Sequence, residues 1–337
     1  MSSRKLVQLK ARITSVAAAA LALVAIAVPA KAQPYPSRSV TILVGYSAGG
    51  QADALARTIG KHLSETLKIS VIIENKTGAN GMIAAQAAAR AEPDGYTILL
   101  VTDAMVAIDP HLATSNHFDL SKAMEPVVNV TWSPLLLAAA NNVPANSVAE
   151  LVALGKKNPQ SLSFGTPGSS TPHRLAGEML QKHGGFTMTH IPYKGTAVSV
   201  NDLVGGQIPL VFGAPTAVVP LATAGKVKLL GVTSEKRYPL LPDVPAISET
   251  FPGFKVISYI GFMLPKKTPT SVITALNKEV NGILTIDTMR AWLDTQGMVA
   301  VGGTPDDFKR LIEVDYQARG DLMRTLGISG DEERSRP

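Results

Sequence analysis

The feature that most constrains the fold of this sequence is a regular alternation of short apolar runs with longer amphipathic segments. Residues 40–44 indicate a buried strand, and residues 52–66 follow with apolar side chains at helical spacing. Further strands are expected at residues 71–73, 96–102, 126–130, 135–139, 162–165, 190–193, 210–213 and 227–233. Further helices are expected at residues 82–91, 147 onwards, 173–183, 197–203, 270–284, 288–296 and 305–326. Apolar strands separated by helices predict an α/β protein with parallel sheets buried on both faces.

Local signals mark where two of these helices begin. Ser147 and Glu150 have the Ser-x-x-Glu spacing of a capping box. Thr304 is expected to cap the last helix, with Pro305 at its first position. The last third of the chain is therefore expected to be mostly helical, and its polar tail, residues 330–337, is expected to fray.

The first 32 residues have the pattern of a secretory signal. Basic residues open the segment, residues 13–28 form an almost unbroken apolar run, and residues 30–32 read Ala-Lys-Ala. Cleavage is expected after Ala32, because this is an A-x-A site behind an apolar core shorter than the roughly 20 residues of a spanning helix. The alternative is a retained membrane anchor.

The charge of the chain is concentrated in that signal. The sequence has 32 Lys and Arg against 26 Asp and Glu, a formal net charge of +6. Residues 1–32 hold five basic residues and no acid, so 27 basic and 26 acidic residues remain in the expected mature chain. A nearly neutral chain removes the electrostatic basis for nucleic-acid binding. No later run is long and apolar enough to span a bilayer, so a soluble, exported protein is expected.

Several kinds of chemistry lack the residues they need. The sequence has no Cys, which excludes disulfides, a thiol nucleophile and a lipid-anchoring thiol. Its six His residues include no pair at metal-site spacing. Neither a G-x-G-x-x-G nor a Gly-Lys-Ser/Thr phosphate loop occurs. No cofactor and no metal are therefore expected.

Residues 45–49, Gly-Tyr-Ser-Ala-Gly, match the G-x-S-x-G nucleophile elbow and lie between an expected strand and helix. In that interpretation Ser47 is the nucleophile of a serine esterase. Only 14 residues, 33–46, precede Ser47 after cleavage, which leaves no room for the upstream loop that completes an oxyanion hole. The alternative is that the turn presents the unpaired N–H groups of a helix start to an anion.

A second loop, residues 165–172, has the same features with more hydroxyl groups, and it leads into His173. At an offset of 120 residues, Gly45, Leu55 and Ala56 coincide with Gly165, Leu175 and Ala176. Two interpretations remain open: a coincidence common in α/β proteins, or two similar lobes that each present a helix start to a shared cleft. Two such sites could clamp a molecule that carries carboxylates.

Together, several segments resemble the periplasmic substrate-binding proteins of tripartite tricarboxylate transporters, the Bug-type receptors. They cover almost the whole expected mature chain in the family's order. The segments are Tyr35-Pro36-Ser37-Arg38, Gly49-Gly50 with Asp53, residues 74–81 (ENKTGANG), Pro93-Asp94-Gly95-Tyr96-Thr97, Leu175-Ala176-Gly177-Glu178, residues 191–195 (IPYKG), residues 232–237 (VTSEKR) and Leu241-Pro242-Asp243-Val244-Pro245.

The resemblance implies a two-lobe periplasmic binding protein-like fold of type 2, in which each lobe is a sheet flanked by helices and the ligand lies in the cleft. It implies a first lobe of residues 33–132 and 256–329 and a second lobe of residues 133–255. The implied function is to capture a small di-, tri- or aromatic carboxylate and to deliver it to membrane permease subunits. A monomer without enzymatic activity, free in the periplasm, is expected.

The resemblance also implies ligand contacts in both lobes. They are Tyr46, Ser47, Ala48, Gly49, Asp53, Thr102, Asp103, Ala104, Gly168, Ser169, Ser170, Thr171, His173, Tyr193 and Ala214. Residues 212–214 read Phe-Gly-Ala where many members have Phe-Asp-Asn, so a carboxylate ligand without an amine is expected. Arg174 either pairs with the ligand or faces solvent, and we favour solvent; Lys194 is a further candidate cation.

Overall fold

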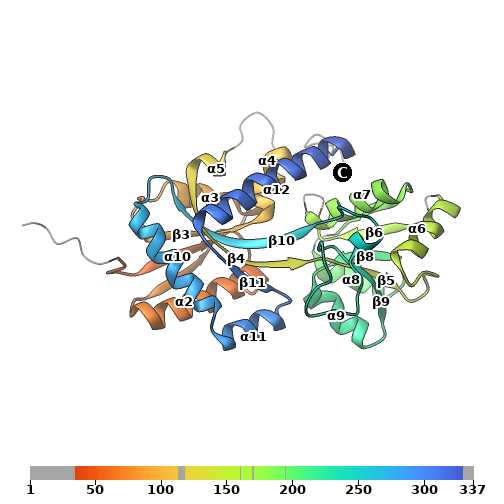
Figure 1. Cartoon of the computed structure of the whole chain (residues 1–337), viewed down its shortest axis with the longest axis horizontal. Helices are drawn as coiled ribbons and strands as arrows, with labels where there is room; N and C mark the ends of the chain where they lie inside the picture. Colours follow the sequence, from red (N-terminus) through yellow and green to blue (C-terminus); the bar gives the residue numbers. More distant parts are fainter. Residues whose placement is uncertain (1–34, 113–117, 160, 169–170, 194, 329–337) are drawn as a thin grey trace, which may run out of the picture. The chain divides into compact units, whose positions relative to one another are not determined.

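The computed structural model describes residues 35–112, 118–159, 161–168, 171–193 and 195–328. The expected signal peptide and the polar tail lie outside these residues. The chain divides at residue 37, and the fold described below is that of the unit that begins at Arg38. It is an α/β fold with two sheets flanked by helices (Figure 1).

The first sheet has six strands in the order β11-β4-β10-β3-β1-β2. Their bounds are β1 Val40–Val44, β2 Val71–Asn75, β3 Thr97–Thr102, β4 Met124–Pro134, β10 Ile257–Pro265 and β11 Val299–Gly302. The second sheet has five strands in the order β7-β6-β8-β5-β9. Their bounds are β5 Leu136–Ala140, β6 Ser163–Thr166, β7 Thr189–Pro192, β8 Leu210–Gly213 and β9 Val227–Val232.

Both sheets are mixed, which corrects the expectation of parallel sheets. Strand β1 pairs in parallel with β2 and β3, and β6 pairs in parallel with β7 and β8. Strand β10 is antiparallel to β3 and β4, β11 is antiparallel to β4, and β5 is antiparallel to β8 and β9. The reversal arises because the chain leaves the first sheet along β4 and returns to it along β10, in the opposite direction.

The helices flank the sheets as the alternation predicts (Figure 1). Those that pack on the first sheet are α2 Gln51–Leu67, α3 Met82–Ala89, α10 Thr270–Leu284 and α12 Pro305–Leu326, and those on the second include α7 Pro172–Gly184, α8 Thr196–Val204 and α9 Pro215–Thr223. The other helical segments are η1 Ala79–Gly81, η2 Ala104–Ile108, α4 Asp109–Leu112, α5 Leu120–Ala123, α6 Val148–Lys157, η3 Ile247–Glu249 and α11 Asp287–Thr295.

The predicted helix starts are confirmed, with one difference. Thr304 caps α12 with Pro305 at its first position, and Ser147 Oγ accepts from Glu150 N–H at 3.1 Å. The Glu150 carboxylate accepts from the N–H of Asn146 instead of that of Ser147, so this capping box is displaced by one residue.

The chain crosses between the sheets at a point that Thr233 holds together. The Thr233 hydroxyl accepts from Leu135 N–H at 2.8 Å and donates to the Val256 carbonyl at 2.5 Å. Its backbone N–H donates to Leu135 and its carbonyl accepts from Val256, each at 2.9 Å. Thr233 is fully buried, so the outgoing and returning segments are tied together out of water. Figure 1 shows β4 and β10 running together toward the second sheet.

Each sheet has a hydrophobic core. In the second sheet Phe164 and Phe212 pack edge to face with ring centroids 6.1 Å apart. In the first, Tyr259 of β10 packs edge to face on Phe308 of α12 at the same separation. The two cores provide rigid supports on either side of the crossing strands.

Candidate functional site

A cavity of about 380 Å³ lies where the ends of β1 and β3, the crossing strands and the start of α7 meet. Its size falls in the range of small-molecule sites. The lining residues are Tyr46, Ser47, Gly50, Gln51, Ala52, Asn80, Thr102, Asp103, Ala104, Thr131, Ser133, Thr171, Pro172, His173, Ser258, Tyr259, Ile260 and Met298. The described lining therefore contains many hydroxyl groups and no Lys or Arg.

The wall from the first sheet begins with Tyr46, just after β1. The Tyr46 hydroxyl lies 2.6 Å from Thr102 Oγ1, and it donates to the Asn80 carbonyl at 3.4 Å. Burial raises the pKa of Tyr46 well above its usual value, so the phenol stays protonated. These contacts join the loops after β1 and β3 into one surface.

Asp53 does not line the cavity but stabilises this wall through hydrogen bonds. Its Oδ2 accepts from the Gly49 N–H and from Arg57 Nε, each at 2.9 Å, and its Oδ1 accepts from Asn75 Nδ2 at 2.9 Å. Asn75 also donates to the Tyr46 carbonyl at 3.0 Å. The hydrogen bond from Arg57 is the main cause that lowers the pKa of Asp53 to about 2; burial opposes it, and Gly49 and Asn75 lower it further.

Helix α2 begins at this wall with Gly50 as its N-cap and without a side-chain cap. Gly50, Gln51 and Ala52 all line the cavity. The first N–H groups of a helix have no partner within the helix, and the dipole of a 17-residue helix adds partial positive charge there. The wall therefore offers an anion site that needs no cationic side chain.

The opposite wall is the start of α7. Thr171 is the N-cap; its hydroxyl donates to the Gly168 carbonyl at 2.9 Å and accepts from Arg174 N–H at 3.5 Å. Pro172 occupies the first helical position, and His173 follows. Both ring nitrogens of His173 are buried, and neither has a hydrogen-bond partner among the described residues. Burial lowers the pKa of His173 to about 4, so its imidazole is neutral at physiological pH.

Crossing strands β4 and β10 form the floor of the cavity. Thr131 and Ser133 alternate on β4, and Ser258 and Ile260 alternate on β10, so each pair projects on the same face of its strand. Thr131 Oγ1 lies 3.6 Å from Met298 Sδ. These residues were not among the expected contacts, because the expected strand ended at residue 130 and no strand was expected at residues 257–265; the alternating polar residues were the available signal.

Asp103 lines the cavity but its carboxylate is already paired. Arg319 Nη1 donates to Asp103 Oδ2 at 2.7 Å, Arg319 Nε lies 2.8 Å from Asp315 Oδ2, and Arg319 Nη2 donates to the Ile257 carbonyl at 2.7 Å. Burial raises the pKa of Asp103, and the Arg319 charge opposes that shift. The buried arginine thus connects α12, the end of β3 and the first residue of β10.

The structure brings together seven of the fifteen expected contact residues. Those lining the cavity are Tyr46, Ser47, Thr102, Asp103, Ala104, Thr171 and His173. Those that do not line it are Ala48, Gly49, Asp53, Gly168, Tyr193 and Ala214. Ser169 and Ser170 lie outside the described residues, as does Lys194.

Two of the residues outside the lining have other contacts. The Tyr193 hydroxyl donates to Asp202 at 2.8 Å, and burial together with that carboxylate raises the pKa of Tyr193 to about 12. Ala214 is the N-cap of α9. Our preference for a solvent-facing Arg174 is wrong: the residue is only 7% exposed and its Nε lies 3.7 Å from Glu178.

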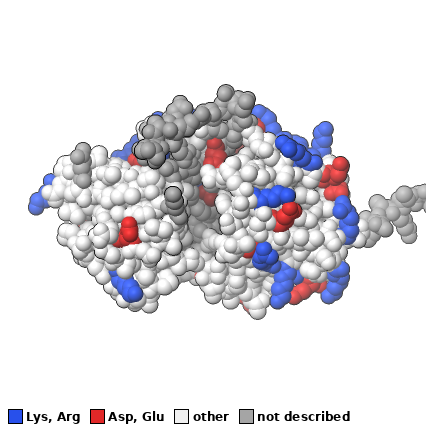
Figure 2. Space-filling view, turned by 180° about the vertical axis from the view of Figure 1, so that it is seen from behind, with Lys and Arg blue, Asp and Glu red and all other residues white. Residues whose placement is uncertain are grey.

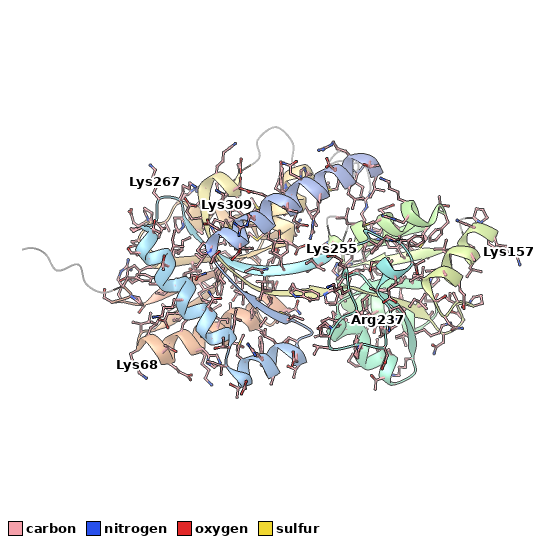
Figure 3. The ribbon with its side chains drawn as sticks, in the orientation of Figure 1. Lys68, Lys157, Arg237, Lys255, Lys267 and Lys309 are labelled. Atoms are coloured by element: carbon pink, nitrogen blue, oxygen red, sulfur yellow. The ribbon has the colours of Figure 1, made fainter. Side chains whose placement is uncertain are left out.

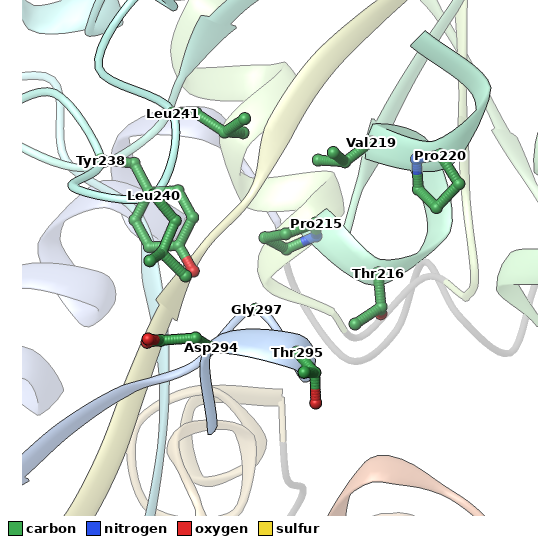
Figure 4. A pocket seen from close by; sticks show the side chains of 10 residues that line it. All are labelled: Pro215, Thr216, Val219, Pro220, Tyr238, Leu240, Leu241, Asp294, Thr295 and Gly297. Carbon is green, nitrogen blue, oxygen red and sulfur yellow. The ribbon is translucent and has the colours of Figure 1, made fainter. Parts of the chain in front are cut away.

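A second cavity, of about 270 Å³, lies between α9, the segment 238–241 and the end of α11 (Figure 4). Its walls are largely apolar, from Pro215, Val219 and Leu241, with Asp294 as the charged group. The start of α9 also lines this cavity, through Pro215 and Thr216. A carboxylate beside Asp294 would be repelled, so this cavity is the poorer anion site.

The charged side chains do not gather into a basic surface. The cations labelled in Figure 3 project at separate places on the ribbon, and none of them lines the larger cavity. On the face seen in Figure 2, Lys and Arg are interspersed with Asp and Glu. Within the described ranges no group of three potential metal ligands is found, and no helix has the length and apolarity needed to cross a membrane.

The two sheets, the crossing strands and the cavity define a two-lobed α/β binding protein. A family model, the tripartite tricarboxylate transporter family receptor, matches residues 55–328. The chain belongs to this family.

Individual relatives agree with this assignment. A UPF0065 protein of Bordetella bronchiseptica is 34% identical over 294 residues, which are 87% of this chain and 87% of that protein. The R. palustris protein Rpa4515, solved with adipate, superimposes with a TM-score of 0.77 at 32% identity, covering 87% of this chain and 98% of its own. MatC of Rhodopseudomonas palustris, solved with bound malate, has a TM-score of 0.72 at 27% identity, covering 86% and 99%.

Proposed function

We propose that this protein captures a small carboxylate in the larger cavity and delivers it to the membrane permease of a tripartite transporter. The observation that carries the proposal is the cavity wall itself: two helix starts, from α2 and α7, and several hydroxyl groups line the cavity, and its described lining includes no Lys or Arg. Helix starts and hydroxyls bind carboxylates through N–H and O–H donors. The relatives solved with adipate and malate support this ligand class.

Closure of two lobes around the ligand is the expected mechanism. We propose residues 33–132 with 256–329 as the first lobe and residues 133–255 as the second, moving about the crossing segments that Thr233 joins. The closed form would differ from the open form in the surface that it presents, which is how a permease could recognise the loaded receptor. We place the protein in the periplasm as a monomer, released by cleavage after Ala32.

The proposed contacts are of two kinds. Ligand donors come from the lining residues, while Asp53 acts behind them by holding Gly49 and Asn75 in place. Asp103, the acidic residue in the described lining, is paired with Arg319. Within the described lining no carboxylate is therefore left for a ligand ammonium group, which supports a ligand without an amine.

A thermal-shift panel tests the ligand class. We expect one class among citrate, C4-dicarboxylates, adipate, phthalates and nicotinate to raise the melting temperature, because a ligand at about 100 times its dissociation constant adds about 2.7 kcal/mol. Hexanediol is the control for adipate, and aspartate, which carries an ammonium in place of a hydroxyl, is the control for malate. A panel without any shift would contradict carboxylate capture, and a stronger shift with aspartate than with malate would contradict the exclusion of amines.

The esterase alternative is less well supported. Ser47 lines the cavity with His173, but the imidazole has no hydrogen bond to Ser47 or to any other described residue. A serine nucleophile needs a base within hydrogen-bond reach. Ester hydrolysis by the wild-type protein that is lost in Ser47→Ala would support this alternative.

A further inference from the structure

Among the described residues, a carboxylate in the larger cavity meets no positive charge that is free to pair with it. Arg319 is held by Asp103 and Asp315, and Arg57 is held by Asp53. Arg174, on the first turn of α7, does not line the cavity and has Glu178 3.7 Å from its Nε. A buried carboxylate without a counter-charge is costly, so donors alone have to hold it or a neutral group has to become charged.

His173 is the group in the described lining that can gain a positive charge. It lies in the first turn of α7 beside Thr171 and Pro172, with both ring nitrogens buried and without partners among the described residues. A neutral imidazole whose two nitrogens are buried without a described partner has one donor and one acceptor available to a ligand. A bound carboxylate can accept from it.

The other titratable groups of the lining do not compete for this role. The Tyr46 phenol bonds to Thr102, and burial raises its pKa well above neutrality. Asp103 is engaged by Arg319. Burial raises the pKa of Tyr259 far above its ordinary value as well, so it stays neutral. On α7 itself, Arg174 Nε lies 3.7 Å from Glu178, so the charges of these two side chains offset one another.

We infer that His173 takes up a proton when the carboxylate binds, so that this receptor captures its ligand together with H⁺. The inference rests on the carboxylate capture proposed above and assigns the counter-charge to one side chain. Without a bound anion, burial and the positive end of the α7 dipole both disfavour an imidazolium. A bound carboxylate reverses the local charge and favours it.

The sign of the pH dependence follows from linkage. The complex binds more protons than the free protein, so affinity rises as the pH falls. The effect acts between the pKa of His173 in the free protein, about 4, and its higher pKa in the complex. In that window the dissociation constant falls by up to about tenfold for each unit of pH.

Calorimetric titration with adipate and with malate tests the inference. At about pH 6, in MES and in Bis-Tris, the difference in binding enthalpy between buffers reports the protons taken up per ligand. We expect close to one proton for the wild type. We expect His173→Gln to bind more weakly and to take up only the small amount that protonation of the ligand itself contributes, since Gln keeps a donor and an acceptor but does not titrate.

Each outcome decides between the proposals. Binding by the wild type with the same proton uptake as His173→Gln would overturn the role of His173 while leaving carboxylate capture intact. No binding of any carboxylate between about pH 5 and pH 8 would overturn carboxylate capture and this inference with it. If His173→Gln fails to fold, NMR titration of the wild-type His side chains with and without ligand takes the place of the variant. We expect the pKa of one imidazole to rise when the ligand binds. Unchanged pKa values would contradict the inference.

Discussion

The two walls of the cavity differ in how their polar groups are satisfied. On the first-sheet wall, Tyr46 is bonded to Thr102, and Asp53 accepts hydrogen bonds from Gly49, Arg57 and Asn75. On the α7 wall, the ring nitrogens of His173 are buried without described partners. The first wall is organised before a ligand arrives, whereas the second keeps hydrogen-bonding capacity that a ligand can use.

This difference suggests that the two walls act at different stages of binding. A preorganised wall binds without a further loss of conformational entropy, so it suits the first contact with a ligand. A wall with unsatisfied groups gains most when the ligand arrives and the lobes close, because leaving buried polar groups unpaired is costly. Substitutions on the two walls should therefore have different consequences for stability and for binding.

The largest effect is expected from Arg319→Met, which removes the support beneath the first wall. The substitution leaves the buried Asp103 and the half-buried Asp315 without their counter-charge, and removal of one partner from a buried ion pair such as Asp103–Arg319 costs about 3–5 kcal/mol. Urea denaturation measures the loss. The matched control is Arg324→Met, which breaks an exposed pair with Asp321 on the same helix and should cost far less. Equal losses in the two variants would contradict a structural role for the buried pair.

A smaller effect is expected from Asp53→Ala. The variant leaves the Gly49 N–H and the Asn75 amide without their acceptor, and we expect a loss of about 1–3 kcal/mol of stability with at least tenfold weaker carboxylate binding. Asp119→Ala is the control: it removes a helix cap from α5, away from the cavity, and should leave binding unchanged. Unchanged binding in Asp53→Ala would mean that the first wall does not depend on this network.

Asp53 also predicts a pH dependence. Its pKa of about 2 in the folded protein is below the ordinary value of 3.8, so it stabilises the fold above about pH 4. That contribution, about 2 kcal/mol, is lost as the pH falls from 4 toward 2. Denaturation curves of wild type and Asp53→Ala should therefore converge in this range, and parallel curves would contradict the assignment.

The smallest effect is expected from Thr171→Ala on the second wall. The variant loses the N-cap of α7 and one of the two hydroxyls that donate to the Gly168 carbonyl, with a cost of about 1 kcal/mol. Because Thr171 lines the cavity, carboxylate affinity should also fall, and this loss should exceed any that follows from the lower stability. Ser147→Ala removes the cap of α6 elsewhere in the second lobe and should lower stability similarly without affecting affinity. A shared effect on affinity would show that α7 has no special role.

Much of the fold could be predicted from the sequence because its signals are local. The run at residues 40–44 and the helix starts at Thr304 and Ser147 appear in the structure as predicted. Sheet direction could not be predicted in this way, since a strand such as β10 has the same apolar composition whether it runs parallel or antiparallel. The direction depends on which strand it meets after the chain returns from the second sheet.

The candidate site likewise combines residues that local patterns predict with residues that only long-range contacts place. The two loops that hold Ser47 and Thr171 and lead into helices were expected from a local pattern, and the family resemblance marked Ser47, Thr171 and His173 as contacts. Arg174 could not be placed from its neighbours, since Glu178 and the packing of α7 decide whether it reaches solvent. Asp53 illustrates the remaining difficulty: the sequence marks it as important, but only the fold shows that it faces Asn75 and Gly49 instead of the cavity.

The sequence by itself determined the α/β class, the near-neutral charge of the expected mature chain, and the two loops that precede helix starts, because each depends on short-range periodicity or composition. Tertiary structure alone decided that Arg319, 216 residues away in the chain, neutralises Asp103. It also decided that the crossing strands form the cavity floor and that the two ring nitrogens of His173 are buried without a described partner. Burial and long-range pairing set the charge state of each group, and neither can be determined from local sequence.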